Sequence, residues 1–354
     1  MGLPNINIKF AKQAATSIAR SEKGVVAIIL RDANANGGVV LTSNTQIPST
    51  LGVENKAYIE RAFIGYVNPP RKVIVYVLPV NAEDLSAALT YLETQTFDYL
   101  VGPTNISPEE CLEVVNWIKA QRADGFKPKA VLPNTAADSE AIINLTTEGI
   151  MVGNVEYAAA GYCSRVAGLI AGTPMTISCT YALLPEVSDV DRLTKSQMDE
   201  AIDSGEFIAF YDGEKVKVGR GINSLQTLTQ EKGETFKKIK IVETVDMIRK
   251  DLKQTIEDHY IGKYSNSYDN KCLLITAIKG YFSGLEDAGI LQKDTSVVEI
   301  DLDVQESYLK EKGIDTSLMN EQEIKSAITG EKVFLKAQIK ILDAIEDIDL
   351  NITI

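Results

Sequence analysis

The chain has 354 residues, of which 45% are hydrophobic and 24% charged, and its formal net charge is -13. This composition is typical of a folded protein with room for two domains, and no apolar run has the length of a membrane span. The negative charge disfavours nucleic acid as a partner, because phosphate binding requires clustered lysine and arginine side chains.

The first predicted element is a strand at residues 5–10. Ile6, Ile8 and Phe10 alternate there with polar residues that include Lys9. Strict alternation is typical of a strand with one buried face, whereas chain ends are usually frayed and polar. A segment of this kind at a chain end therefore requires an explanation.

The next part of the chain predicts a domain built on a parallel sheet. A buried strand is expected at 25–30, with a hairpin partner at 39–42 across the turn residues between them. Strands are then expected at 72–79, 97–102, 129–134 and 149–153, and helices at 82–95 (capped by Asn81), 107–125 (with Ser107 and Glu110 as a capping box) and 139–145. Such alternation indicates a small, mainly parallel sheet with helices on its faces.

A helix rich in alanine and glycine is predicted at 156–172. Its small residues allow another backbone to approach closely, which fits either a packing interface or an ordinary buried helix of the first domain.

The remaining elements predict an α+β second domain. They are a hairpin at 207–222 with Asp212-Gly213 at its turn, a strand at 237–242, and helices at 244–260, 269–288 and 304–312.

The chain ends in two alternating segments, and we expect them to form a terminal hairpin. The apolar positions of 333–341 include Val333, Leu335, Ile339 and Ile341, and in 347–354 Asp347 and Asp349 alternate with Ile348, Leu350 and Ile352.

The two chain ends carry opposite charges. Residues 1–20 contain three basic and no acidic residues, and residues 343–354 contain four acidic and no basic residues. Unpaired alternating strands are aggregation hazards unless they have a designated partner. Pairing between copies of the chain, in which opposite charges favour head-to-tail contacts, and pairing within one chain both remain open.

No stretch carries a catalytic, cofactor-binding or metal-binding motif. The loops after the predicted parallel strands place Asp or Glu at helix starts, where they complement the helix dipole and repel phosphate. The stretch "GRGINS" at 219–224 departs from a dinucleotide loop, because Ser224 replaces the third glycine. The four cysteines are scattered, and a single histidine, His259, cannot form a histidine-rich metal site. We therefore expect no enzyme, with no catalytic, cofactor or metal residues.

Several segments, in order along the chain, resemble the contractile phage tail sheath family, most closely the short sheaths of Gram-positive myophages, defective prophages and R-type bacteriocins. They are "MGLPNINIKFAKQAATSIARSEKGVVAIILRD", "AGLIAGTP", "VGRGINSLQTL" with "KGETFKKIKIVETVDMIRKDL" and "YIGKYSNSYDNK", and "LDAIEDIDLNITI".

The resemblance implies a structural protein without a cofactor. Subunits would stack as hexameric rings into a helical sheath around a tail tube, with baseplate and tail terminator proteins as further partners and no membrane insertion. Assembly would take place in the cytoplasm of the bacterial host, and the product would belong to a virion or phage-like particle that contracts to drive the tube through a cell envelope.

The resemblance also implies an α/β plus α+β architecture with extended β arms. Residues 1–23 would form an N-terminal arm, 24–184 an outer α/β domain, 185–342 a sheath-core α+β domain and 343–354 a C-terminal arm strand. Hinges are expected just inside the arms, at Ser21 to Gly24 and at 343–346. The arm strands would contain Ile6, Ile8, Lys9, Phe10, Val333, Leu335, Ile339, Ile341, Asp347, Ile348, Asp349, Leu350 and Ile352.

Two alternatives accompany this hypothesis. One is an α/β enzyme of unknown chemistry, and the other is a different self-assembling phage tail component.

Overall fold

A computed structural model describes residue 18 and residues 23–353 of the chain. The predicted strand at 5–10, with Ile6, Ile8, Lys9 and Phe10, therefore lies outside the described residues. The chain divides into two compact units. We call the described part of Glu22–Asp246 with Asp343–Ile354 the sheet unit, and Met247–Leu342 the helical unit.

The sheet unit is built on a seven-stranded sheet with the order β2-β3-β1-β4-β5-β6-β9. All neighbours are parallel except β2, which is antiparallel to β3. The strands are β1 (Val25–Arg31), β2 (Gly37–Leu41), β3 (Lys72–Leu78), β4 (Tyr99–Val101), β5 (Lys129–Pro133), β6 (Ile142–Leu145) and β9 (Glu206–Phe207).

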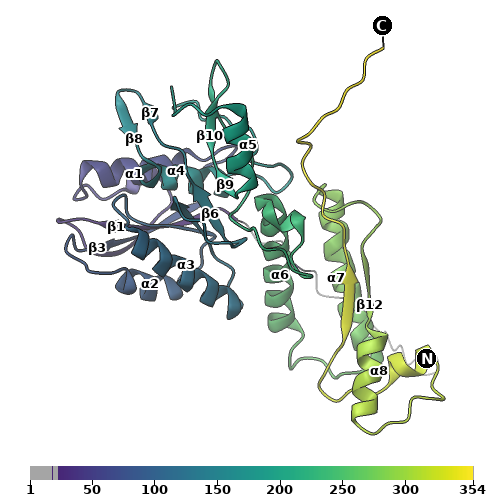
Figure 1. The fold of residues 1–354 in the computed structure, drawn as a ribbon. Helices are drawn as coiled ribbons and strands as arrows, with labels where there is room; N and C mark the ends of the chain where they lie inside the picture. Colours follow the sequence, from purple (N-terminus) through teal and green to yellow (C-terminus); the bar gives the residue numbers. More distant parts are fainter. Residues whose placement is uncertain (1–17, 19–22, 354) are drawn as a thin grey trace, which may run out of the picture. The chain divides into compact units, whose positions relative to one another are not determined.

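Helices cover both faces of this sheet, as Figure 1 shows. Helices α1 (Val53–Ile64) and α4 (Ala159–Ala171) pack with Val26, Ile28 and Leu30 of β1. Helices α2 (Ser86–Glu93) and α3 (Pro108–Ala123) pack with the intervening residues of the same strand. Because successive strand side chains point to opposite faces, the central strands must be apolar at nearly every position.

Smaller elements complete the sheet unit. They are η1 (Asn44–Gln46), the hairpin of β7 (Ile150–Val152) and β8 (Val155–Tyr157), α5 (Lys195–Asp203), the hairpin of β10 (Ala209–Tyr211) and β11 (Val216–Val218), η2 (Glu234–Lys237) and the first part of α6 (Ile239–His259). The hairpin predicted at Asp212-Gly213 is thereby confirmed.

The domain division differs from the boundary predicted after residue 184. Strand β9 adds to the sheet beside β6, and the β10–β11 hairpin packs into the same core. Residues 185–246 therefore belong with the sheet, and the division falls inside α6.

Three local predictions in the sheet unit are wrong. The segment 39–42 does not pair with β1, because β3 and β4 occupy both edges of β1 and β2 joins β3 instead. The segment predicted as a helix at 139–145 contains β6, whose isoleucines pair with β5. Asn81 caps no helix, since α2 begins at Ser86, after Leu85.

Two further predictions of sheet strands are wrong. The strand at 149–153 is present as β7, but it pairs with β8 in a separate hairpin and not with the parallel sheet. The strand predicted at 237–242 is instead the end of η2 and the start of α6. Residues 239–244 are all buried there, which hides the helical period in the sequence.

Other predictions are confirmed in detail. Helix α3 begins with the capping box of Ser107 and Glu110. Helix α4 is an internal helix of the sheet unit, because nearly every one of its side chains is buried. Close packing against α1 explains part of the high content of small residues in α4. A Cβ atom on Gly168 would lie 2.0 Å from the carbonyl oxygen of Ala62 in α1.

The helical unit contains the rest of α6 and a small antiparallel sheet. Helix α7 (Tyr268–Asp287) precedes β12 (Val297–Ile300), and α8 (Leu302–Glu311) and α9 (Glu321–Ser326) follow before β13 (Leu335–Gln338). Strand β13 pairs with β12, with Val298 opposite Ala337. The buried Val298 and Ile300 give this small sheet its apolar side.

Candidate functional site

The C-terminal segment exposes a row of apolar side chains. Ile348, Leu350 and Ile352 are 78%, 77% and 75% exposed, and no strand is assigned within residues 343–353. Alternating apolar residues suit a strand with one buried face, but nothing in the described chain buries this one. The segment therefore has the pattern of a strand without the partner that would make it one.

The second predicted strand is only partly formed, and it does not pair with the C-terminal segment. Leu335 lies in β13 opposite Ile300, and Ile341 forms an isolated bridge with Leu291. Val333 and Ile339 flank β13. The expected hairpin with 347–354 is absent, because residues 343–353 form no strand and β13 pairs with β12. Among the described residues, no other strand pairs with β13.

The root of the C-terminal segment is bound to the sheet unit. Lys238 forms an ion pair with Asp343, and Arg220 forms one with Asp347. Between them, Glu346 accepts a hydrogen bond of 2.6 Å from the hydroxyl of Thr180 and lies 3.5 Å from both Arg220 and Lys238. Two cations and a hydroxyl thus hold three carboxylates.

The electrostatics of this cluster favour its charged forms. The hydrogen bond to Asp347 raises the pKa of Arg220, and the same bond lowers the pKa of Asp347. Burial acts against the charge on Lys238, but the carboxylates of Asp343 and Glu346 raise its pKa overall. The ion pairs therefore persist across the neutral pH range.

The stretch "GRGINS" at 219–224 contributes Arg220 to this cluster. Arg220 lies between two closely packed glycines, and a Cβ atom on Gly221 would lie 2.8 Å from the Sγ atom of Cys179. Ser224 donates a hydrogen bond to the carbonyl oxygen of Ser139. The glycines thus permit close packing inside the sheet unit.

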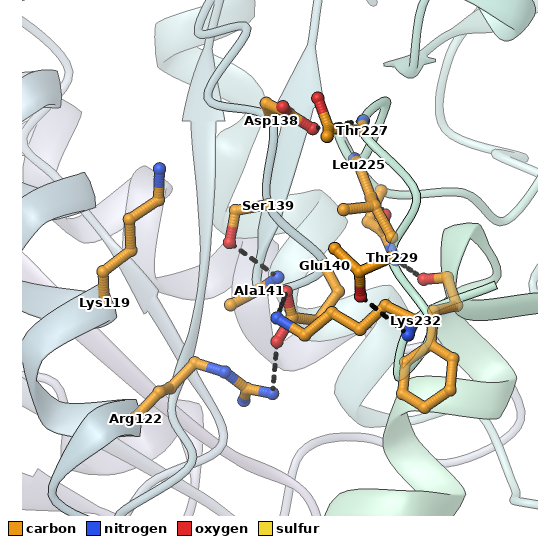
Figure 2. Close-up of polar contacts among 12 residues, drawn as sticks. Lys119, Arg122, Asp138, Ser139, Glu140, Ala141, Leu225, Thr227, Thr229 and Lys232 are labelled. Atoms are coloured by element: carbon orange, nitrogen blue, oxygen red, sulfur yellow. Dashed lines mark hydrogen bonds and ion pairs between the residues drawn. The ribbon is translucent and has the colours of Figure 1, made fainter. Parts of the chain in front are cut away.

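The acidic residues at the ends of the sheet strands make structural contacts. Figure 2 shows Glu140 between Arg122 and Lys232, with oxygen–nitrogen distances of 3.2 and 3.0 Å. Asp138 accepts the backbone N–H groups of Gln226 and Thr227 at 2.7 and 2.8 Å. Hydrogen bonds from Thr227 and Gln226 lower the pKa of Asp138 to about 2. These carboxylates bind their own chain.

The part of the chain that the structure describes offers neither a metal centre nor a membrane span. It contains no group of three or more His, Cys, Asp or Glu side chains placed to hold a metal ion. None of its helices has the length and hydropathy needed to cross a membrane.

Comparison with known proteins now decides the family. The family model of the phage tail sheath protein central domain matches residues 79–224, and that of the phage tail sheath C-terminal domain matches residues 231–354. The tail sheath protein of Clostridium phage phiCD119 is 42% identical over 99% of both chains. The chain belongs to the phage tail sheath family. It is a structural subunit of a tail sheath, and so a component of a virion or phage-like particle.

Solved sheath structures share the fold of this sheath protein. The helical sheath of the anti-feeding prophage in its contracted state matches with a TM-score of 0.73 at 17% identity, covering 100% of this chain and 99% of that one. The sheath tail protein of Desulfitobacterium hafniense matches with a TM-score of 0.71 at 17% identity, covering 84% and 94%.

Sequence reasoning singled out the acidic end of the sheath chain but missed its partners. Arg220 and Lys238 lie more than one hundred residues before Asp343 and Asp347. The opposite charges were visible in the sequence, but no spacing rule connects residues so far apart. Asp347, which the sequence predicts in an arm strand, forms an ion pair with Arg220 of its own chain.

Proposed function

We propose that this sheath protein polymerises around a tail tube through its terminal segments, and that the polymer contracts to drive the tube through a cell envelope. In this proposal the C-terminal segment adds as a strand to a sheet of another copy. The observation that carries it is the row of Ile348, Leu350 and Ile352, each at least 75% exposed in the single chain.

The physical reason is the free energy that such pairing recovers. Burying one large aliphatic side chain stabilises by about 1.5–3 kcal/mol. The burial of three such side chains and the backbone hydrogen bonds of a new strand together stabilise the pairing. This stabilisation offsets the conformational entropy that a short segment loses when it becomes ordered. The open edge of β13 in another copy, beside Val333, Leu335, Ile339 and Ile341, is the partner that we propose.

Charge supports a head-to-tail arrangement of copies. The N-terminal residues 1–20 are basic, and Lys9 lies within the alternating stretch that contains Ile6, Ile8 and Phe10. Asp347 is already paired with Arg220. Asp349 is therefore the acidic residue that we propose to face a basic arm of another copy.

We propose the remaining partners from the family. They are copies of the chain in stacked hexameric rings, a tail tube protein, and the baseplate and tail terminator proteins, with assembly in the cytoplasm of the bacterial host. The segment 303–328 is our candidate for the tube-facing surface, because Leu318 and Ile328 are 94% and 83% exposed. We also propose that the sheet unit, which contains the predicted outer domain 24–184, faces the outside of the sheath.

The test changes the apolar face of the arm and leaves its root intact. The triple variant Ile348→Asn, Leu350→Asn, Ile352→Asn removes the apolar row, and the control Asn351→Ser, Thr353→Ser changes the polar positions of the same segment. We expect tubes from the wild type and the control in negative-stain microscopy and none from the triple variant. Tubes of equal yield from all three proteins would contradict arm pairing.

A further inference from the structure

We propose that Thr180, Arg220 and Lys238 form an anchor for residues 343–347, so that the free C-terminal arm begins only at Ile348. This inference rests on the proposed function where it concerns load on the arm, but the anchor itself is a property of the single chain. It gives a role to the stretch "GRGINS", which the family assignment leaves unexplained.

The first support is the contrast in burial along the segment. The side chain of Glu346 is only 8% exposed, whereas that of the next residue, Asp347, is 79% exposed. Ile345 and Ile348 on either side of this pair are 87% and 78% exposed. A segment that lay loosely on the surface would leave the charged residue in water. Here the acidic residue is inside and the apolar residues are outside, so the contacts of Glu346 hold the segment in place.

The second support is the fixed position of the binding groups. The hydroxyl of Thr180 accepts the backbone N–H of Gly221 at 2.9 Å, which directs its proton to Glu346. The carbonyl oxygen of Gly221 accepts the N–H of Ile239 at 2.9 Å. The anchor is therefore assembled before the acidic segment binds, which lowers the entropic cost of binding.

The third support is the arrangement of charge at both ends. Asp343 pairs with Lys238 and Asp347 with Arg220, so the segment is held at its first and last residues with Glu346 between them. Exposed ion pairs are weak one at a time, but several charges in one network act together. These contacts hold the segment 343–346, where the resemblance to the family implied a hinge, against the sheet unit.

The anchor has two mechanical consequences. Residues 348–353 span about 20 Å when extended, so a strand partner for the apolar row must begin within that distance of Asp347. Release of the anchor would add five residues, or about 16 Å, to the free arm. Tension on an anchored arm also enters the sheet unit at Arg220 and Lys238 and does not pull on β13 of the helical unit.

The test compares proteolysis of the unassembled chain at two neighbouring sites. Thermolysin cleaves before apolar residues, so cleavage before Ile345 reports the anchored segment, and cleavage before Leu350 reports the free arm. In the variant Arg220→Ala, Lys238→Ala we expect the ratio of the first cut to the second to rise at least tenfold. The control Lys195→Ala, Lys253→Ala removes the same charge from exposed pairs and should leave the ratio unchanged.

A second variant guards against a change in the fold. Glu346→Ala alters only the bound segment, so it cannot disturb the sheet core, and it should also raise the ratio. An unchanged ratio in both variants would overturn the anchor, whatever the protein assembles into. A failure of the wild-type chain to form tubes would instead count against arm pairing, and the cleavage ratio would still decide whether the anchor exists.

The load on the arm is tested separately in assembled tubes. We expect tubes of the variant Arg220→Ala, Lys238→Ala to disassemble at a lower urea concentration than tubes of the wild type and of the lysine control. A higher cleavage ratio with equal resistance of the tubes would support the anchor and overturn its load-bearing role.

Discussion

Single residues decide how closely the layers of the sheet unit approach. Gly168 is the sharpest case, because α4 crosses α1 with no room for a side chain at this position. Gly161 lies on the same helix, but a Cβ atom there would lie 3.3 Å from a ring carbon of Tyr157, which is a side chain that can move. The two glycines therefore differ in what they allow, although the sequence presents them alike.

We expect Gly168→Ala to destabilise the sheet unit by about 1–3 kcal/mol, since overpacking forces the two helix backbones apart. Gly161→Ala is the matched control and should change the free energy of unfolding by less than about 1 kcal/mol. Urea unfolding, followed by tryptophan fluorescence of Trp117 in the sheet unit, measures both. Equal effects of the two substitutions would contradict the close contact between α1 and α4.

At the scale of elements, buried charges attach the start of α6 to the sheet. Glu243 lies 2.9 Å from Lys23 and 3.2 Å from Lys129 of β5, and it also accepts a hydrogen bond from Tyr99 of β4. One turn later, Asp246 pairs with Arg122 of α3 at 2.9 Å. Four elements thus meet through one network of ion pairs.

The network predicts a strong effect of Glu243→Gln. The change leaves Lys129 buried with fewer negative partners, and breaking a buried pair typically costs about 3–5 kcal/mol. The control Glu257→Gln removes an exposed pair on the same helix and should cost less than about 1 kcal/mol. Urea unfolding at pH 7 measures the difference, and similar values for both variants would refute a structural role for the network.

The lowered pKa of Glu243 predicts that the stability of the protein depends on pH. Burial opposes its charge, but Lys129 and Lys23 lower the pKa of Glu243 from 4.5 to about 2. The unfolded chain therefore binds this proton first as the pH falls, so the contribution of Glu243 is complete above pH 4.5 and is lost between 4.5 and about 2. We expect the stability difference between the wild type and Glu243→Gln to shrink over this range. A difference that stays constant from about pH 6 to about pH 3 would contradict the assignment.

At the scale of the whole molecule, the chain combines two compact units with end segments whose sequences carry opposite charge. Both units have their own buried residues, whereas Ile348, Leu350 and Ile352 of the C-terminal segment are exposed. Folding and assembly should therefore be separable by changes at the ends.

Deletion of residues 1–20 tests this separation. We expect the truncated chain to lose polymerisation, because a proposed arm is gone, while both units stay folded. Electron microscopy reports the polymer, and calorimetry reports whether the thermal transitions are unchanged. Tubes of normal yield from the truncated chain would refute a role of the N-terminal arm in assembly.

Charge reversal tests the proposed direction of pairing. Lys9→Glu should weaken assembly, because it places like charges near Asp349, and Asp349→Lys in the same chain should partly restore it. Polymer yield at several salt concentrations is the measurement, since screening should reduce the effect. The idea of charge pairing fails if neither change alters the yield.

The sequence by itself determined the elements whose signals are local. The capping box of Ser107 and Glu110 fixes the start of α3, the apolar run at 25–30 becomes β1, and the turn at Asp212-Gly213 forms its hairpin. The sequence also indicated the family, because segments that resemble it occur in the same order along the whole chain. Such a pattern depends on the fold as a whole and not on a single contact.

Only the tertiary structure decided the partners. Strand β2 pairs with β3 because β1 has no free edge, β13 pairs with β12, and Arg220 meets Asp347 across more than one hundred residues. Alternation and charge say that a segment needs a partner, but they carry no distance information along the chain. Which strand edge or charged group becomes the partner depends on which ones remain accessible after the rest of the chain has packed. That packing exists only in the folded chain.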